Sequence, residues 1–481
     1  MKNRFILLIT GILLTVSAIC QSYYEKWIST PLDDYPEKVS WLNGDNILLI
    51  THQGIYSDNY YEKFDYTNVL YKTDYELNFN DSTTIDSIGN YKLLIKDVIK
   101  SDDDGMLLWA KALHSQTQDE QLCLLWMNND LNIINDSIYG LPDVAEVISG
   151  FIVNQEGNLI FTGATSFEPI AGDYILWEFD INGQELNKVM HQGDMQELPT
   201  IIEVPGTQKY HVCSRFETLQ FDYNLNFDTL YYFNDTLGMI PNGYNKKVND
   251  FQYLRTGLYL TPPVPGSPWQ FEMAFALVDE NTAVLDFHTF GTQDTIDNPG
   301  ILDFITTDTI YFGGTNNLIF NPPENSWVLL YKTNMEGEIL ENIYWGGGGQ
   351  YEFADILALN EGGYLMTATR WDFNNFPADY KRDIMIVTEN YGAFVTGVNN
   401  KKRPEIKNIF VYPNPGNDVL KISSAKNNLL FQLFDFTGKT VIEQHFDKYI
   451  KINTQRLPAG MYFFNIIQNS KVITSGKWVK E

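Results

Sequence analysis

The sequence predicts an all-β protein, a seven-bladed β-propeller over residues 21–400 followed by a small β-sandwich over residues 409–481. Three observations support this fold class. A unit of four apolar strands and two tight polar turns recurs about every 50 residues, which is a period typical of propeller blades. No amphipathic stretch of helical period interrupts the units. After a basic linker at residues 401–408, the sequence changes to short alternating strands.

The first twenty residues are expected to be a signal peptide. Lys2 and Arg4 precede an apolar run, and small residues follow, which is the order of a secretory signal. Cleavage is expected after Cys20; a lipidated Cys20 is less favoured, because Ile19 stands where a small residue is expected. No later stretch approaches the roughly 20 apolar residues that a membrane helix needs, so no transmembrane segment is expected in the mature protein.

The mature protein is predicted to be acidic in its body and basic in its tail. Without the signal the net charge is −30, with −34 on residues 21–403 and +4 on residues 404–481. This balance argues against a nucleic-acid surface, since phosphate binding needs clustered lysine and arginine. The two remaining cysteines, Cys123 and Cys213, lie in apolar runs and are predicted to be buried free thiols.

In each unit a tight turn follows the first strand, and the turn contains a glycine in all units but one. Such a turn often needs a residue with positive φ, which costs glycine no steric strain. The apolar run after the turn is the expected second strand of the blade, and the next hairpin supplies the third and fourth strands. The anchoring residues are Gly44, Gly105, Gly157, Gly206, Gly257, Thr307 and Gly362.

A segment before the first unit is expected to close the ring. Residues 23–29, YYEKWIS, are strand-like and are expected to add a strand to the seventh blade. The units resemble kelch-type repeats more than WD repeats, because the GH and WD signatures are missing from their expected places. The double glycine of kelch repeats stands only at Gly313–Gly314 and Gly362–Gly363.

The loops between second and third strands are the expected binding region. They are long and rich in aromatics and proline, whereas the turns on the opposite face of the propeller are short and polar. Variable loops on a rigid scaffold usually carry binding, and aromatic faces beside carboxylates suit sugar rings. The alternative is that these rings pack their own loops. The candidates are Phe167, Trp269, Trp371 and Tyr380, with Tyr56, Tyr60, Tyr61, Phe64, Phe320 and Phe373 on the same rim.

Two arginines, Arg215 and Arg370, are expected at matching positions on that face. Each ends the second strand of its blade, in a body with few basic residues. Equivalent arginines could clamp a carboxylate or a sulfate through paired hydrogen bonds. Salt bridges with the abundant acidic residues are the alternative.

No motif assigns a catalytic residue. HExxH, GxSxG, the Walker loop, CxxC and GxGxxG are absent from the sequence, and the six histidines do not cluster along it. No metal site and no cofactor are therefore expected. Ca²⁺ is a weakly supported alternative, because oxygen ligands are plentiful but Asp102, Asp103 and Asp104 are consecutive and do not alternate as in a calcium loop.

The C-terminal residues carry four motifs in order: VYPNPGNDVLKI, LFDFTGKTV, LPAGMYFFNI and GKWVK. Together they resemble the type A C-terminal sorting domain of the type IX (Por) secretion system. The resemblance implies Sec export, contact with the type IX machinery, removal of the tail by a sorting peptidase, and anchoring at the cell surface or release. The matching residues are Pro413, Asn414, Pro415, Gly438, Leu457, Pro458, Gly460 and Lys477.

The sequence therefore predicts a secreted or surface-anchored binding protein whose propeller engages a glycan or a protein. The alternative is a hydrolase or lyase that acts on polysaccharide at the same face. A binding protein is favoured over an enzyme, since no catalytic motif is found.

Overall fold

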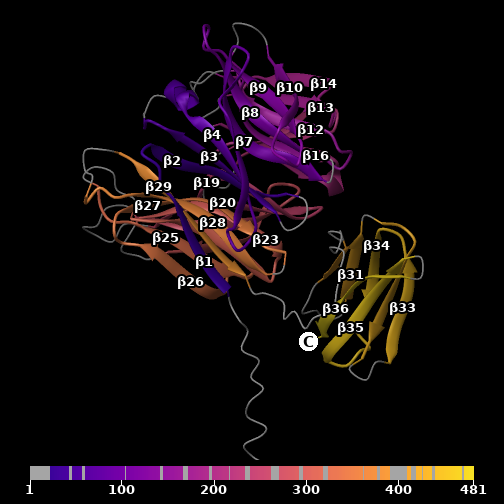
Figure 1. Cartoon of the computed structure of the whole chain (residues 1–481). Helices are drawn as coiled ribbons and strands as arrows, with labels where there is room; N and C mark the ends of the chain where they lie inside the picture. The colour runs from indigo at the N-terminus through magenta and orange to yellow at the C-terminus, as the bar shows by residue number, and fades with distance from the viewer. Residues whose placement is uncertain are drawn as a thin grey trace, which may run out of the picture. The chain divides into compact units, whose positions relative to one another are not determined.

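The computed structural model describes residues 22–390 and 409–480 (Figure 1), with gaps at 43–45, 57–59, 103–104, 141–144, 166–171, 194–197, 216, 233–238, 262–269, 292–295, 318–322, 361, 376–379, 413–418, 425, 436–438 and 469–470. The chain divides into two compact units, Met1–Phe394 and Val395–Glu481. The predicted signal peptide and linker lie outside the described residues. No helix in the described part of the chain is long and apolar enough to cross a membrane.

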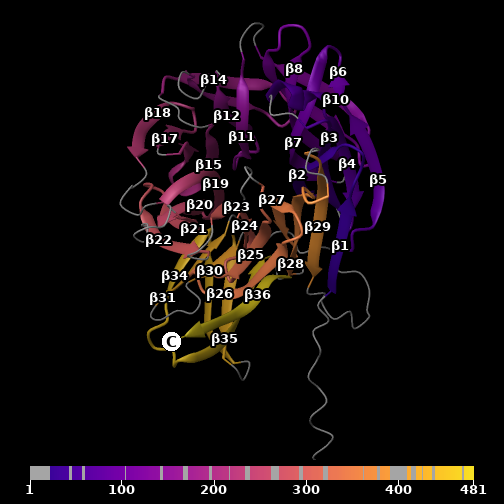
Figure 2. The same cartoon turned by 90° about the vertical axis from the view of Figure 1, so that its left-hand side faces the viewer.

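Seven antiparallel sheets form a ring in the first unit, as the repeat predicts (Figure 2). The first strand of each sheet lies nearest the axis of the ring. Blades one to three comprise β2 (Asp33–Trp41), β3 (Ile47–Gly54), β4 (Thr67–Thr73) and β5 (Phe79–Ile85); β6 (Ser87–Ile88), β7 (Tyr91–Asp102), β8 (Gly105–His114), β9 (Glu120–Met127) and β10 (Ile133–Tyr139); and β11 (Val147–Val153), β12 (Leu159–Ala164), β13 (Tyr174–Phe179) and β14 (Glu185–His191).

Blades four to seven continue the pattern around the ring. They comprise β15 (Thr200–Val204), β16 (Lys209–Cys213), β17 (Glu217–Asp222) and β18 (Phe227–Tyr232); β19 (Met239–Asn249), β20 (Gln252–Thr261), β21 (Gln270–Asp279) and β22 (Val284–Phe290); β23 (Asp297–Thr306), β24 (Thr309–Asn316), β25 (Trp327–Thr333) and β26 (Ile339–Gly346); and β27 (Gln350–Ala358), β28 (Gly363–Trp371) and β29 (Arg382–Asn390) with β1 (Ser22–Ile28). Two short 3₁₀ helices, η1 (Tyr60–Asp65) and η2 (Pro205–Thr207), lie in connections.

The seventh blade is closed by the N-terminal strand, which confirms the closing strand expected from the sequence. β1 pairs antiparallel with β29 from Ser22 opposite Asn390 to Ile28 opposite Ile384. It thus takes the outermost place, where the other blades have a fourth strand. The second half of the hairpin that the sequence predicts for this blade, from residue 391, lies outside the described residues.

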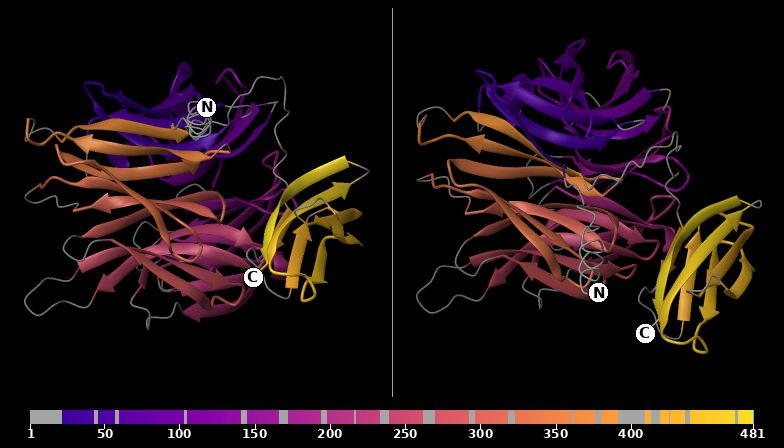
Figure 3. Two further views of the ribbon diagram at one scale, coloured as in Figure 1. Left: turned by 90° about the horizontal axis from the view of Figure 1, so that it is seen from below. Right: turned by 60° about the horizontal axis from the view of Figure 1, so that its bottom comes forward.

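The hydrophobic core is divided among the seven interfaces between neighbouring blades. Each interface has its own cluster of buried side chains, drawn from facing strands of two adjacent sheets. Cys123 and Cys213 are buried free thiols, as predicted. Figure 3 shows the sheets from two further sides, each twisted about its strands as β-sheets are.

The innermost strands are locally irregular. Six of the seven, β2, β7, β11, β19, β23 and β27, carry a register shift against the second strand of their blade, and only β15 pairs without one. An extra residue in a strand bends it and re-aims its side chains.

The hairpin between the third and fourth strands repeats one turn in blades one to six. An Asp or Asn at the end of the third strand accepts backbone N–H bonds from the residues that follow it, and the residue three positions on has positive φ. Asx side chains form such turns readily. In blades one, two and four the positive-φ residue is a buried leucine: Leu77, Leu131 and Leu225.

One predicted turn is wrong. Gly257 lies inside β20, opposite Pro241 of β19, and the turn between these strands falls at residues 250–251. That turn contains no glycine, because the side chain of Asn249 accepts the backbone N–H of Phe251 and holds the bend. Gly257 has another role: a Cβ there would lie 2.5 Å from the carbonyl oxygen of Ile240, so the close approach of the two strands requires glycine.

The second unit consists of two packed sheets, as the sequence predicts for a small sandwich. One sheet is β30 (Ile409–Tyr412), β31 (Val419–Ser424) and β34 (Tyr449–Asn453); the other is β33 (Thr440–Phe446), β32 (Leu429–Phe434), β35 (Gly460–Gln468) and β36 (Lys471–Lys480). Their shared core is built around Trp478, Phe431 and Phe464.

Candidate functional site

The predicted ligand-binding residues fall at the loop ends of several blades. Phe167 and Trp269 lie outside the described residues. Arg215 follows β16 in blade four, whereas Arg370 and Trp371 end β28 in blade seven. Blades four and seven are separated by two complete blades, so the structure does not bring the two arginines together.

Four of the predicted rim aromatics form one cluster where blades seven and one meet. The ring centroids of Tyr56 and Tyr380 are 4.0 Å apart, those of Trp371 and Tyr380 are 4.6 Å apart, and those of Trp371 and Phe373 are 5.7 Å apart. Trp371 is buried, whereas Tyr56, Phe373 and Tyr380 remain half-exposed. We call these four residues the rim cluster. Loops of two different blades thus build a joint aromatic surface.

The rim cluster is anchored by Arg382, the first residue of β29. Its guanidinium donates to both carboxylate oxygens of the buried Asp33, with Nε to Oδ1 at 2.9 Å and Nη2 to Oδ2 at 2.7 Å. Its flat face lies 5.6 Å and 5.5 Å from the ring centroids of Tyr56 and Tyr380. A bidentate ion pair with stacked rings fixes the geometry of the loops on both sides.

Two further polar side chains face this position from the innermost strands. Tyr35 of β2 lies with its ring centroid 4.9 Å from the Arg382 guanidinium. Burial raises the pKa of Glu352 of β27 above its usual value, and the positive charges of Arg382 and Lys63 oppose that rise. A carboxyl group with a raised pKa holds its proton to higher pH than an exposed one, so Glu352 is the candidate proton donor of the site.

An ion network joins the innermost strands of blades seven, one and two. The Lys38 ammonium lies 3.4 Å from Asp355 and 3.9 Å from Asp97, and Asp355 also accepts the backbone N–H of Val39 at 2.8 Å. Burial raises the pKa of Asp355 to about 6, although Lys38 opposes the shift. All these groups have partners, so the network holds neighbouring blades together.

Arg370 is engaged by its own blade. Its guanidinium forms an ion pair with Asp372 at 3.1 Å and donates to the carbonyl oxygen of Gly348 at 3.3 Å. It also lies 5.8 Å from the ring centroid of Trp27 on the closing strand. These contacts correspond to the salt-bridge alternative raised by the sequence.

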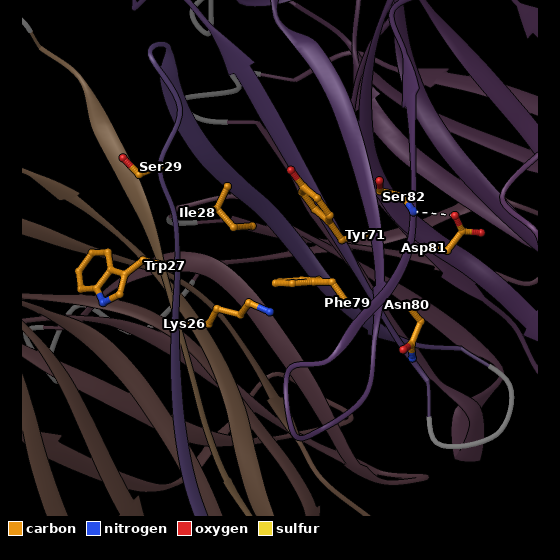
Figure 4. Close-up of a pocket in the computed structure, with 9 residues that line it drawn as sticks. All are labelled: Lys26, Trp27, Ile28, Ser29, Tyr71, Phe79, Asn80, Asp81 and Ser82. Carbon is orange, nitrogen blue, oxygen red and sulfur yellow. Dashed lines mark hydrogen bonds between the residues drawn. The ribbon is translucent and has the colours of Figure 1, made fainter.

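A groove lies on the outer wall, between β1 and β5 (Figure 4). This groove has a volume of about 550 Å³ and is bordered by Asn80, Asp81 and Ser82 on one side and Ser29 on the other. Lys26 lies 4.1 Å over the Phe79 ring and donates to the carbonyl oxygen of Leu77 at 2.9 Å. Because Lys26 and Tyr71 both pack on Phe79, this ring offers little free face for stacking.

No group of three or more His, Cys, Asp or Glu side chains that could hold a metal ion is found among the residues that the structure describes. The residues that sequence reasoning missed are Asp33, Tyr35, Glu352 and Arg382, all in or beside strands. They come together only because blades seven and one are neighbours in the closed ring.

Among the comparisons with known proteins, the family match lies in the tail. Residues 410–481 match the family model of the secretion system C-terminal sorting domain. A sorting domain of this kind implies contact with the type IX machinery and export to the cell surface or the exterior. Leu457, Pro458, Gly460 and Lys477 lie in its described residues, whereas Pro413, Asn414, Pro415 and Gly438 do not. No curated protein matches the chain.

Solved structures that are similar to the chain have low sequence identity with it. The WD40 domain of Pan2 from Neurospora crassa has 9% identity and a TM-score of 0.40, and the match covers 74% of this chain and 89% of that one. The β-propeller domain of the Trilobed protease from Pyrococcus furiosus has 11% identity and a TM-score of 0.41, covering 75% and 96%. The polysaccharide lyase Uly1 has 10% identity and a TM-score of 0.39, covering 74% and 90%.

Proposed function

We propose that this exported protein is a binding protein that engages a glycan through the rim cluster of its propeller. The observation that carries the proposal is the joint aromatic surface of Tyr56, Trp371, Phe373 and Tyr380, built by loops of two blades and fixed by the Arg382–Asp33 pair. Rigid rings with half-exposed faces beside hydroxyl and carboxyl groups suit the C–H faces and hydroxyls of a sugar.

The test is glycan retention by the purified chain from residue 21 onward, with Tyr56→Ala and Tyr380→Ala combined. We expect at least tenfold weaker retention of the bound glycan, because the loss of ring contacts worth about 1.4 kcal/mol weakens binding tenfold. Tyr232→Ala is the matched control, because Tyr232 is 70% exposed on the outermost strand of blade four. Unchanged retention in the double variant would contradict the rim cluster as the binding surface.

The alternative is a hydrolase or lyase that acts on polysaccharide at the same place. Glu352 favours it, since burial raises the pKa of this carboxyl beside Arg382 and Tyr35. Reducing-end release from the same polymers should be followed in parallel. Release that is lost in Glu352→Gln supports an enzyme; retention without release supports the binding protein.

A further inference from the structure

Beside the rim cluster, two polar groups have no hydrogen-bond partner in the part of the chain that the structure describes. They are the hydroxyl of Tyr35 in β2 and the carboxylate of Glu352 in β27. Both side chains are half-buried, and the residues before and after each of them in its strand are buried. The nearest carboxylates in β2, Asp33 and Glu37, are by contrast paired with basic side chains. Open hydrogen-bonding groups next to an aromatic surface are available to a ligand.

Glu352 lies close both to Tyr35 and to the rim cluster. Burial raises the pKa of Tyr35 and of Tyr380, and the negative charge of Glu352 reinforces both shifts. The Arg382 guanidinium, 4.9 Å from the ring centroid of Tyr35, also acts on the charge of Glu352. A ligand that packs its flat face on Tyr380 therefore brings its edge near the two open polar groups.

The two open groups match the hydroxyls of an uncharged sugar. An ionised carboxylate only accepts hydrogen bonds, whereas a tyrosine hydroxyl both donates and accepts them. One sugar hydroxyl can therefore donate to Glu352 while another bonds to Tyr35. A carboxylate or sulfate on the ligand has no proton to donate to Glu352, and its negative charge is repelled.

Two positive charges act on Glu352, and neither is placed to offset this repulsion. The charge of Arg382 is compensated by Asp33, which accepts two hydrogen bonds from the guanidinium. Lys63 of η1 is exposed to water, which screens its charge. A binding surface discriminates strongly against a ligand that would place a like charge beside one of its own charged groups.

We propose that Glu352 makes the surface at the rim cluster selective for uncharged sugars and excludes uronic acids and sulfated sugars. The sugar packs its face on Tyr56 and Tyr380 and directs hydroxyls to Glu352 and Tyr35. This inference rests on the proposed glycan binding and specifies the class of glycan that is bound. Glu352 is then the residue that determines specificity, and the aromatic rings supply contact area.

The experiment compares the retention of neutral and sulfated polysaccharides by the purified chain from residue 21 onward. Dextran, mannan, xylan and a β-1,3-glucan are each paired with their own sulfated derivative. Retention is measured at pH 8, far above the usual carboxyl pKa, so that Glu352 carries its charge. We expect the neutral member of a retained pair to bind roughly tenfold more tightly, because like charges face each other in the sulfated one.

In Glu352→Gln the preference for the neutral polymer should fall roughly fivefold, because the amide keeps the shape of the side chain and removes its charge. Glu272→Gln is the matched control, since Glu272 is a half-buried glutamate of β21 in blade five, outside the rim cluster. Both variants remove one charge from a body that carries −34, so any general repulsion of sulfated polymers is the same in both.

A preference that falls in Glu352→Gln and not in Glu272→Gln supports the proposal. An equal preference in the two variants overturns it, as does a wild type that retains the sulfated polymers as well as the neutral ones. If the wild type retains no polymer of either kind, glycan binding itself fails, and not merely its selectivity.

The thermal midpoint of each variant shows whether it is folded. If Glu352→Gln is unfolded, Tyr35→Phe decides, because this change removes only the hydroxyl that is expected to bond to the sugar. Retention of the neutral polymer should then fall about threefold, the usual effect of losing one hydrogen bond to a ligand. Unchanged retention in a folded Tyr35→Phe variant overturns the proposal.

Discussion

The buried histidine His211 makes the stability of the propeller depend on pH. Its side chain is fully buried at the interface of blades four and five, with Nδ1 3.3 Å from the Tyr253 hydroxyl and Nε2 3.0 Å from the Gln220 amide. Burial, reinforced by the charges of Arg255 and Lys209, lowers the pKa of His211 from 6.5 to about 4. The folded protein therefore keeps this imidazole neutral where the unfolded chain would protonate it.

The consequence is a loss of stability as pH falls from 6.5 to about 4. Above pH 6.5 His211 is neutral in both the folded and the unfolded protein, so its contribution to stability is fully present. Below pH 6.5 the unfolded chain binds a proton at His211 that the folded protein does not bind. The shift from 6.5 to about 4 corresponds to roughly 3 kcal/mol. In His211→Gln this part of the pH dependence should vanish, as measured by urea unfolding at pH 7 and pH 4.5.

The difference between wild type and variant isolates His211, because Glu37, whose pKa is lowered to about 2, and Asp355, whose pKa is raised to about 6, change protonation in both proteins alike. His445→Gln, at an exposed position of the second unit, controls for the substitution. If the free energy of unfolding changes equally between pH 7 and pH 4.5 in the wild type and in His211→Gln, another group dominates the pH dependence of stability.

The residues of the candidate site also differ in how well they can be predicted from the sequence. Trp371 and Tyr380 were predictable because aromatic residues concentrate in long loops. Arg382 and Asp33 were not, since each looks like an ordinary strand residue and they are 349 positions apart in sequence. Their pairing depends on the closure of the ring, which no local pattern encodes.

Among the elements, the hairpins between third and fourth strands do more than reverse the chain. In five interfaces a side chain of one blade donates to a backbone carbonyl of this turn in the next. The donors and acceptors are Lys26 to Leu77, Lys72 to Asn129, Tyr139 to Gly183, Asn187 to Asn224, and Gln220 to Glu280. Between blades six and seven Lys332 instead forms an ion pair with Glu389, 2.6 Å away. The turns thus link neighbouring blades near the outer wall.

We expect loss of one turn acceptor to weaken this link. Asp222 of blade four accepts the backbone N–H groups of Asn224 and Asn226 at 2.9 Å and 2.8 Å. Asp222→Ala should therefore lower the free energy of unfolding by about 1 kcal/mol, the usual cost of removing such a local acceptor. Asn224→Ala is the control, since it keeps the backbone carbonyl that Asn187 uses and should change stability by less than about 0.5 kcal/mol. Equal effects of the two variants in urea unfolding would contradict the role of the Asp222 side chain.

The elements were more predictable than the turns. Six of the seven second strands follow the apolar runs read from the sequence, because alternation and β-branched residues are local signals, whereas β20 begins earlier than its run, at Gln252. The prediction that a glycine marks the turn was wrong at Gly257. Glycine is also not required at the turn residue Leu225, because its positive φ is offset by burial of its side chain in the core between blades three and four. Tertiary packing overrides the local preference at such positions.

For the whole molecule, β1 is the piece that turns an open series of sheets into a closed ring. It pairs with β29 over seven residues and packs Tyr24 and Ile28 against the core between blades seven and one. Ser29 and Thr30 then bond to Asp383 and Asp34, which ties the strand to both blades. Without it, β29 would be an exposed edge, and such edges invite non-native pairing.

We expect a chain that begins at Asp33 to melt roughly 5–10 °C lower than the mature protein, since several kcal/mol of pairing and burial are removed and each ~1 kcal/mol shifts Tm by a few degrees in a large domain. A synthetic peptide of residues 22–32 should restore the midpoint at saturating concentration, as followed by circular dichroism. The same peptide with Glu25→Pro and Trp27→Pro should not, because proline removes ladder hydrogen bonds. An unchanged midpoint in the shortened chain would show that β1 is dispensable for closure.

The closing strand was predictable as a candidate because the segment before the first repeat is strand-like and the last blade needs a further strand to close the ring. Its pairing register with β29 was not, since neither strand carries a turn that fixes it.

Closure by β1 also sets the order in which strands can pair in a chain that is synthesised and exported starting from its N-terminus. The hydrogen bond between Ser29 and Asp383 spans 354 positions, so the first strand of the body must wait for the last one before it has a strand to pair with. Long-range pairings of this kind form late. The sorting module, matched from residue 410, follows β29 within a few tens of residues. The complete ring and the sorting module therefore become available almost together, and a chain whose synthesis stops earlier has neither.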